Sequence, residues 1–154
     1  MRVGHAGVAV AAKRFGPRVP LWLLLCAAYA PDIIEVGLRP FGLYNRELSH
    51  SLVSVGIGAA LLAVIYAAVR RDGRGAVCLW SVYLLHWPAD FITGHKPTWP
   101  GGPIVGLDLY DRPVLVWIVD LAILAAGCWV YGKGRKPAVP HGSCTVGSET
   151  LSEH

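Results

Sequence analysis

Histidine and carboxylate side chains stand at the ends of several apolar segments of this chain. They occur in residues 31–35 (Pro-Asp-Ile-Ile-Glu), in residues 49–51 (Ser-His-Ser), and in residues 86–90 (His-Trp-Pro-Ala-Asp), with His95 shortly after. Such groups are costly next to lipid and need a compensating partner. One divalent cation shared by imidazole and carboxylate ligands supplies that partner, so the pattern predicts a metal site.

His86 and Asp90 form the strongest single motif. They are four residues apart, which places them on one face of a helix about 5–6 Å from each other, close enough to bind one ion. A buried hydrogen bond between the two side chains is an equally good interpretation of the motif taken alone. Pro88 between them removes a backbone hydrogen bond and favours a bend.

Asp32, Glu35 and His50 extend the set. Asp32 directly follows apolar residues and Pro31, which favours ligation, whereas Glu35 is as consistent with a solvated helix end as with a functional role. His50 is either an interfacial residue or a ligand. Taken together, Asp32, His50, His86 and Asp90 are a set of two histidines and two carboxylates, which suits zinc best and also manganese or iron.

The composition indicates that a membrane surrounds these residues. Of 154 residues, 54% are hydrophobic and 16% charged, with a mean hydropathy of +0.47, whereas soluble domains carry about 25% charged residues. The net charge of +4 comes from basic residues scattered over short loops, which argues against nucleic-acid binding. The four cysteines form no CxxC pair, which argues against a disulfide framework or a thiolate zinc site.

Three apolar segments predict transmembrane helices, at residues 51–69, 75–92 and 113–131. Each approaches the roughly 20 residues needed to cross a bilayer. Asp120 lies within the last segment and should face protein, either as a partner of a ligand histidine or as part of a proton or ion pathway. The expected fold class is therefore all-α, an integral membrane helical bundle.

The front of the chain predicts a short helical hairpin. Two brief apolar stretches, residues 3–12 and 19–30, are separated by turn and charged residues at 13–18. A bend near residues 17–19 would bring His5 back to the level of Asp32. A signal peptide cleaved after residues 28–30 is the alternative. We expect residues 1–131 to form one membrane-embedded domain and residues 132–154 a polar, disordered tail.

The basic residues predict the orientation of this bundle. Nine Lys and Arg residues fall at one end of the predicted helices and five at the other, so the end with nine should be cytoplasmic. The candidate ligands then lie at the extracytoplasmic face.

The chain also resembles the bacterial inner-membrane metal-dependent hydrolases. The resemblance rests on His5, Ala-Pro-Asp at 30–32, Ser-His-Ser at 49–51 and the run from Tyr83 to Asp90. The order of ligands is similar to that of zinc-dependent phospholipase C and the single-strand-specific zinc nucleases. It implies that Asp32, His50, His86 and Asp90 hold the principal metal and that His5 and His95 serve a second one. The HxxxE motif of the phospholipases has no counterpart after His95, so one or two ions are expected.

These observations lead to two main functional hypotheses. The first is a membrane-bound metal-dependent hydrolase in which a metal-activated water attacks a substrate and Glu35 or Asp90 takes the proton. The resemblance to the phospholipases implies a phosphoester or lipid-like substrate, with membrane lipid as the partner, no nucleic acid, and protein partners left open. The second is a non-enzymatic metal- or proton-binding membrane protein, such as a transport or assembly factor. A helical protein with buried polar pairs and no metal is the third interpretation.

Overall fold

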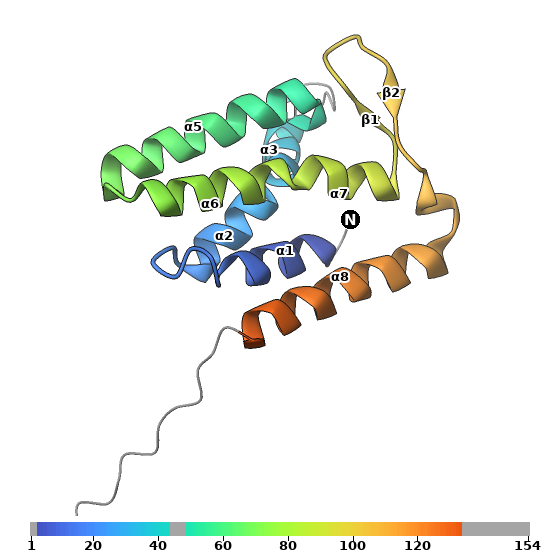
Figure 1. Ribbon diagram of the computed structural model, residues 1–154. Helices are drawn as coiled ribbons and strands as arrows, with labels where there is room; N and C mark the ends of the chain where they lie inside the picture. The colour runs from blue at the N-terminus through green and yellow to red at the C-terminus, as the bar shows by residue number, and fades with distance from the viewer. Residues whose placement is uncertain (1–2, 44–48, 134–154) are drawn as a thin grey trace, which may run out of the picture.

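The computed structural model describes residues 3–43 and 49–133, and within them nearly all regular structure is helical (Figure 1). Two strands of two residues each form an antiparallel hairpin, with Lys96 opposite Val105 and Pro97 opposite Ile104. The elements are α1 (Gly4–Ala12), α2 (Leu21–Ala28), α3 (Ala30–Leu38), the 3-10 turn η1 (Arg39–Phe41), α5 (Leu52–Arg70), α6 (Gly73–Leu84), α7 (His86–Thr93), β1 (Lys96–Pro97), β2 (Ile104–Val105), the 3-10 turn η2 (Leu109–Asp111) and α8 (Pro113–Lys133). The tail predicted for residues 132–154 lies, from residue 134 on, outside the described residues.

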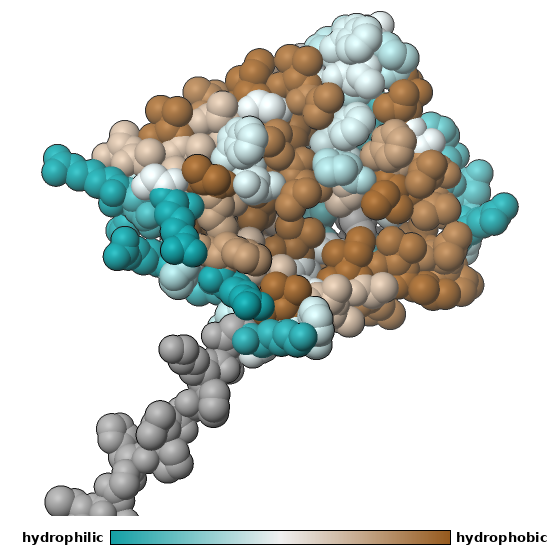
Figure 2. All heavy atoms as spheres, in the orientation of Figure 1, coloured by the Kyte–Doolittle hydropathy of each residue, from teal (hydrophilic) through white to brown (hydrophobic). Residues whose placement is uncertain are grey.

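Two helices, α5 and α8, are long and apolar enough to cross a membrane. They confirm the helices predicted at residues 51–69 and 113–131. Ser51 caps the start of α5, because its side chain accepts a hydrogen bond from the backbone N–H of Ser54. The outward face of α5 exposes large apolar side chains, among them Ile57, Leu61 and Val64. The brown surface of Figure 2 shows how widely apolar residues cover this face of the molecule.

The third span, predicted at residues 75–92, is not confirmed. The chain forms two helices there, α6 with 12 residues and α7 with 8, separated at Leu85. Pro88 explains the break, because it has no N–H to donate to the carbonyl of Leu84 and its ring clashes with that carbonyl. Each helix alone is shorter than the roughly 20 residues of a membrane span.

The predicted front hairpin is present, and it continues into a bent pair of helices. α1 and α2 pack against each other, and the Lys13 ammonium donates to the backbone oxygens of Pro17 and Val19 in the turn between them. α2 then meets α3 at an angle of 62°. Neither helix alone is long enough to cross a membrane, but the two together are long and apolar enough to form one bent span. Pro31 stands at the start of α3, where its missing N–H ends the hydrogen bonding of α2.

α1 lies directly on α8 because two glycines face each other. A methyl group added to Gly7 would come within 2.6 Å of the Ile123 oxygen, and one added to Gly127 would collide with the backbone of Gly7. At the start of α1, the buried carboxylate of Asp120 accepts a hydrogen bond from the Val3 N–H at 3.2 Å. Asp120 therefore serves one of the backbone donors that the first turn of a helix leaves unpaired.

The core lies between α2 and α6, where Leu24, Leu79 and Val82 are almost fully buried. The two ends of the molecule differ in charge. The end that contains the α5–α6 turn carries exposed basic side chains, including Arg70, Arg71 and Arg74, and teal residues gather there in Figure 2. At the opposite end, the beginnings of α1 and α7 converge with α3 (Figure 1), and this convergence positions the candidate site.

Candidate metal centre

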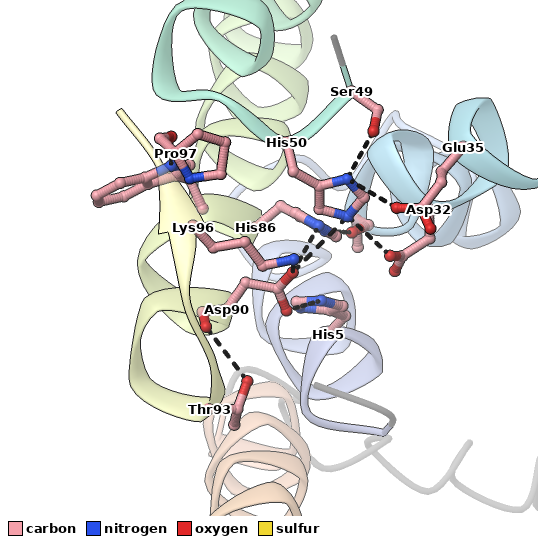
Figure 3. Close-up of polar contacts among 12 residues, drawn as sticks. His5, Asp32, Glu35, Ser49, His50, His86, Asp90, Thr93, Lys96 and Pro97 are labelled. Atoms are coloured by element: carbon pink, nitrogen blue, oxygen red, sulfur yellow. Dashed lines mark hydrogen bonds and ion pairs between the residues drawn. The ribbon is translucent and has the colours of Figure 1, made fainter. Parts of the chain in front are cut away.

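Four predicted ligands meet at this end of the molecule (Figure 3). Asp32 lies in the first turn of α3, His50 directly before α5, and His86 and Asp90 on one face of α7. Each offers one ligand atom, and these four atoms lie within 4.8 Å of one another. The group could therefore hold a metal ion.

The spacing of these atoms matches a tetrahedral ion. Bonds of about 2.0–2.1 Å place neighbouring ligand atoms of tetrahedral zinc about 3.3 Å apart. His50 Nε2 lies 3.1 Å from Asp32 Oδ1 and 3.8 Å from Asp90 Oδ2. His86 Nε2 lies 3.3 Å from the same oxygen of Asp90. Three of the six distances between the ligand atoms are therefore close to those expected around one ion.

The hydrogen bonding of His86 directs a lone pair to that centre. His86 Nδ1 lies 2.9 Å from the carbonyl oxygen of Ala28. A carbonyl oxygen only accepts, so Nδ1 carries the hydrogen and donates it. In the neutral ring Nε2 is then an acceptor, and it is buried without an aligned hydrogen-bond partner among the described residues. A proton or a metal ion at Nε2 would offset the repulsion between this lone pair and the Asp90 carboxylate.

The bend between α2 and α3 makes this contact possible. Ala28 is the last residue of α2, and the last carbonyls of a helix have no donor within their own helix. One of these carbonyls fixes the imidazole of a ligand on α7. The proline-induced break therefore orients a side chain 58 positions further along the chain.

His50 is oriented by a carboxylate on the side of the ring away from the other ligands. Its Nδ1 lies 3.2 Å from Glu35 Oε2 and 2.8 Å from Ser49 Oγ. Donation from Nδ1 to either oxygen would leave Nε2 free to bind a metal, the arrangement that commonly fixes ligand histidines. Glu35 is held in turn by Arg39, whose Nη2 lies 3.1 Å from Glu35 Oε1. The geometry gives Glu35 the place of an orienting group.

His5 lies beside the four ligands. Its ring stacks on His86 with centroids 4.2 Å apart, and its Nε2 lies 3.3 Å from Asp90 Oδ1. Burial lowers the pKa of His5 below its ordinary value, although the contact with Asp90 acts in the opposite direction. His5 therefore lies next to the group of four and contacts two of its members, His86 and Asp90.

Lys96 enters the site as a residue that the sequence pattern missed. Its Nζ lies 2.6 Å from Asp90 Oδ2, and the side chain is 12% exposed. Burial alone would raise the pKa of Asp90, but the contacts with His5 and His86 and the charge of Lys96 hold this pKa well below its usual range. Nothing in the sequence distinguished Lys96 from the other basic residues of the loops.

His95 does not join the cluster, contrary to the predicted role in a second metal site. Its Nδ1 lies 3.4 Å from Asp108 Oδ1, and both side chains are exposed. The physical reason is the strand that follows α7. Gly94 is extended, and successive residues of an extended chain point to opposite sides. Because Lys96 turns toward Asp90, its neighbour His95 turns away.

The charges around the site leave one acid without a cationic partner among the described residues. Lys96 pairs with Asp90, and Arg39 pairs with Glu35. Asp32 instead contacts the His50 ring. The Asp32 side chain is 42% exposed while those of His50 and Asp90 are nearly buried. A divalent ion would balance this charge, and Asp32 is the member of the group most open to solvent.

Comparisons with known proteins give no match, whether against protein-family models, curated proteins or solved structures. The resemblance to the membrane hydrolases therefore rests on the residues quoted for it.

Proposed function

We propose that this protein is a membrane-bound metal-dependent hydrolase that cleaves a phosphoester at the extracytoplasmic face. The observation that carries the proposal is the convergence of Asp32, His50, His86 and Asp90, together with the His86 lone pair that faces the centre of this group. Two histidines and two carboxylates suit zinc, with manganese or iron as substitutes.

The protein side chains divide the work of such a reaction. Asp32, His50, His86 and Asp90 would hold the ion. For catalysis the ion would have to bind water in addition to these four ligands, and it would then lower the pKa of that water and polarise a phosphoryl oxygen. Glu35 and the Ala28 carbonyl fix the rings of His50 and His86. The Lys96 ammonium beside Asp90 would stabilise negative charge on the phosphoryl group.

The balance of the reaction is that of ester hydrolysis. The oxygen of water forms a bond to phosphorus, and the phosphorus–oxygen bond to the alcohol breaks. The proton released by water ends on the departing alcohol oxygen. Both oxygens of Asp90 face histidine or lysine, and both oxygens of Glu35 face His50 or Arg39. We therefore assign the proton transfer to Asp32, the more exposed carboxylate.

Metal content and hydrolysis test this proposal together. Detergent-purified protein should carry about one equivalent of zinc, as four protein ligands imply. His86→Ala and Asp32→Ala should lose the metal and the hydrolysis of a water-soluble phosphodiester, while both properties persist in His95→Ala, because His95 lies outside the cluster.

Two results would contradict the proposal. Hydrolysis that persists after the metal is removed would show that the reaction does not depend on a metal bound by these four residues. Bound metal with no cleavage of phosphomonoesters or phosphodiesters would favour the non-enzymatic alternative, a metal-binding membrane protein.

A further inference from the structure

An apolar groove is lined by residues of α2 and α3. Its volume is about 670 Å³, within the roughly 300–1,000 Å³ range of small-molecule sites. Besides Asp32, the residues that line it are Leu25, Cys26, Tyr29, Ile33, Val36 and Gly37.

The groove is continuous with the metal centre through one residue. Asp32 lines the groove and is also one of the four ligands. The other three ligands are buried. A molecule that approaches the ligand group along Asp32 therefore passes the apolar wall of this groove.

The lining tells what kind of molecule fits. Apart from Asp32, every residue in it has an apolar or weakly polar side chain or none. Burying a charged or strongly polar group there would be unfavourable, whereas a hydrocarbon chain gains free energy for each methylene removed from water. At Asp32 the requirement reverses, because a cation held there attracts an anionic group.

We propose that this groove holds the hydrocarbon chain of the substrate while the phosphoester lies at the metal centre. The substrate is then an amphiphile, and the groove selects it by chain length. This inference rests on the proposed function and deepens it by naming the substrate class. A membrane lipid that merely covers the groove is the competing occupant, and it would not make hydrolysis depend on the substrate chain.

Filling the groove tests the proposal directly. A Cβ on Gly37 meets nothing within 4 Å, so Gly37→Phe places a ring in the groove without a clash. Cys26→Phe does the same from α2, where Cys26 is exposed. The matched control is Gly56→Phe on α5, where an added Cβ also meets open space.

The measurement is kcat/KM for phosphodiesters of one head group with alkyl chains of two to twelve carbons, at fixed detergent concentration, alongside zinc content. In the wild type kcat/KM should rise about fourfold per methylene until the groove is full. Gly37→Phe and Cys26→Phe should lose about tenfold or more in kcat/KM on long chains, since two methylenes account for such a factor, and the loss should shrink as the substrate chain shortens. Zinc content should be the same in all four proteins.

The outcomes separate the two proposals. Equal chain-length dependence in the filled variants, the wild type and Gly56→Phe would overturn the groove while leaving the hydrolase in place. If no substrate of any length is cleaved by zinc-loaded protein, the proposed function fails. Photolabelling with a long-chain alkyl phosphate that carries a diazirine then decides the groove on its own. Labels on α2 and α3 that Gly37→Phe abolishes support it, and labels elsewhere overturn it.

Discussion

Three of the four candidate ligands contact a second polar group that holds the ring or carboxylate in place. His86 is held by the Ala28 carbonyl, His50 by Glu35, and Asp90 by Lys96. Such outer partners fix the tautomer and the direction of the lone pair. Substituting a side chain that holds a ligand in place, such as Glu35 or Lys96, is therefore more informative than substituting the ligand itself.

Glu35 offers the sharpest test at this scale. Glu35→Ala removes the carboxylate beside His50 Nδ1 and leaves Ser49 Oγ as its neighbour. We expect zinc affinity to fall about 10- to 100-fold, the usual effect of losing such a partner. Competition with a fluorescent zinc chelator measures the change. Arg39→Ala is the control, because it leaves the contact between Glu35 and His50 in place. Unchanged zinc affinity with a large loss of kcat would instead make Glu35 the proton acceptor.

The four ligands could be predicted from the sequence because they mark segment ends. Carboxylates and imidazoles next to apolar runs are costly unless they share a partner, so Asp32, His50, His86 and Asp90 could be grouped without coordinates. The Ala28 carbonyl could not be predicted, because any residue can supply a carbonyl. His95 and Lys96 could not be told apart either, since the direction of each depends on where α7 ends and how the hairpin turns.

At the scale of elements, two broken helices build the site. Pro31 separates α3 from α2, and Pro88 separates α7 from α6. The sequence indicated that Pro88 favours a bend, but the apolar character of residues 75–92 suggested a single span. The hydropathy of a segment indicates whether its surroundings are apolar. Whether the helix breaks depends on whether neighbouring groups can replace the backbone hydrogen bonds that are lost, and hydropathy does not reveal this.

Pro88→Ala tests the break between α6 and α7. The substitution restores a backbone N–H that can bond to Leu84, which favours one continuous helix. Because successive residues of a helix turn by about 100°, a small change at the break redirects His86 and Asp90. We expect zinc binding to weaken at least tenfold, measured by metal content after dialysis. Pro113→Ala is the control, since proline is well tolerated at the start of α8. Wild-type zinc content in Pro88→Ala would contradict this account.

The hairpin matters because it carries Lys96 into the site. Trp87 Nε1 donates to the Pro97 oxygen and the Leu107 N–H to the Phe91 oxygen, so both limbs are attached to α7. We expect Lys96→Met to keep its zinc and to lose about 10- to 100-fold in kcat/KM for an anionic phosphodiester, as for removal of a group that stabilises developing negative charge. The His95→Gln variant, one position earlier, should match the wild type. A wild-type rate in Lys96→Met would show that the ammonium serves only to neutralise Asp90.

At the scale of the whole molecule, two glycines set the distance between the first helix and the last. Gly127→Leu would push a side chain into the α1 backbone at Gly7. Overpacking of this kind typically costs about 1–3 kcal/mol. We expect the thermal unfolding midpoint in detergent to fall by several degrees, with weaker zinc binding because α1 carries His5. Gly132→Leu on the same helix, where an added Cβ meets open space, should unfold like the wild type.

No single helix in the described part of the chain carries all the residues of the site. Asp32, His50 and the pair on α7 come from three separate parts of the chain, and His5 from a fourth. Binding energy gained only when all of them are in place counts as folding energy. The order of assembly follows from this. A chain inserted only as far as α5 holds Asp32 and His50 but lacks His86 and Asp90, so a zinc ion would be retained only after α7 has docked. Metal uptake would thus report that the chain has assembled as far as α7.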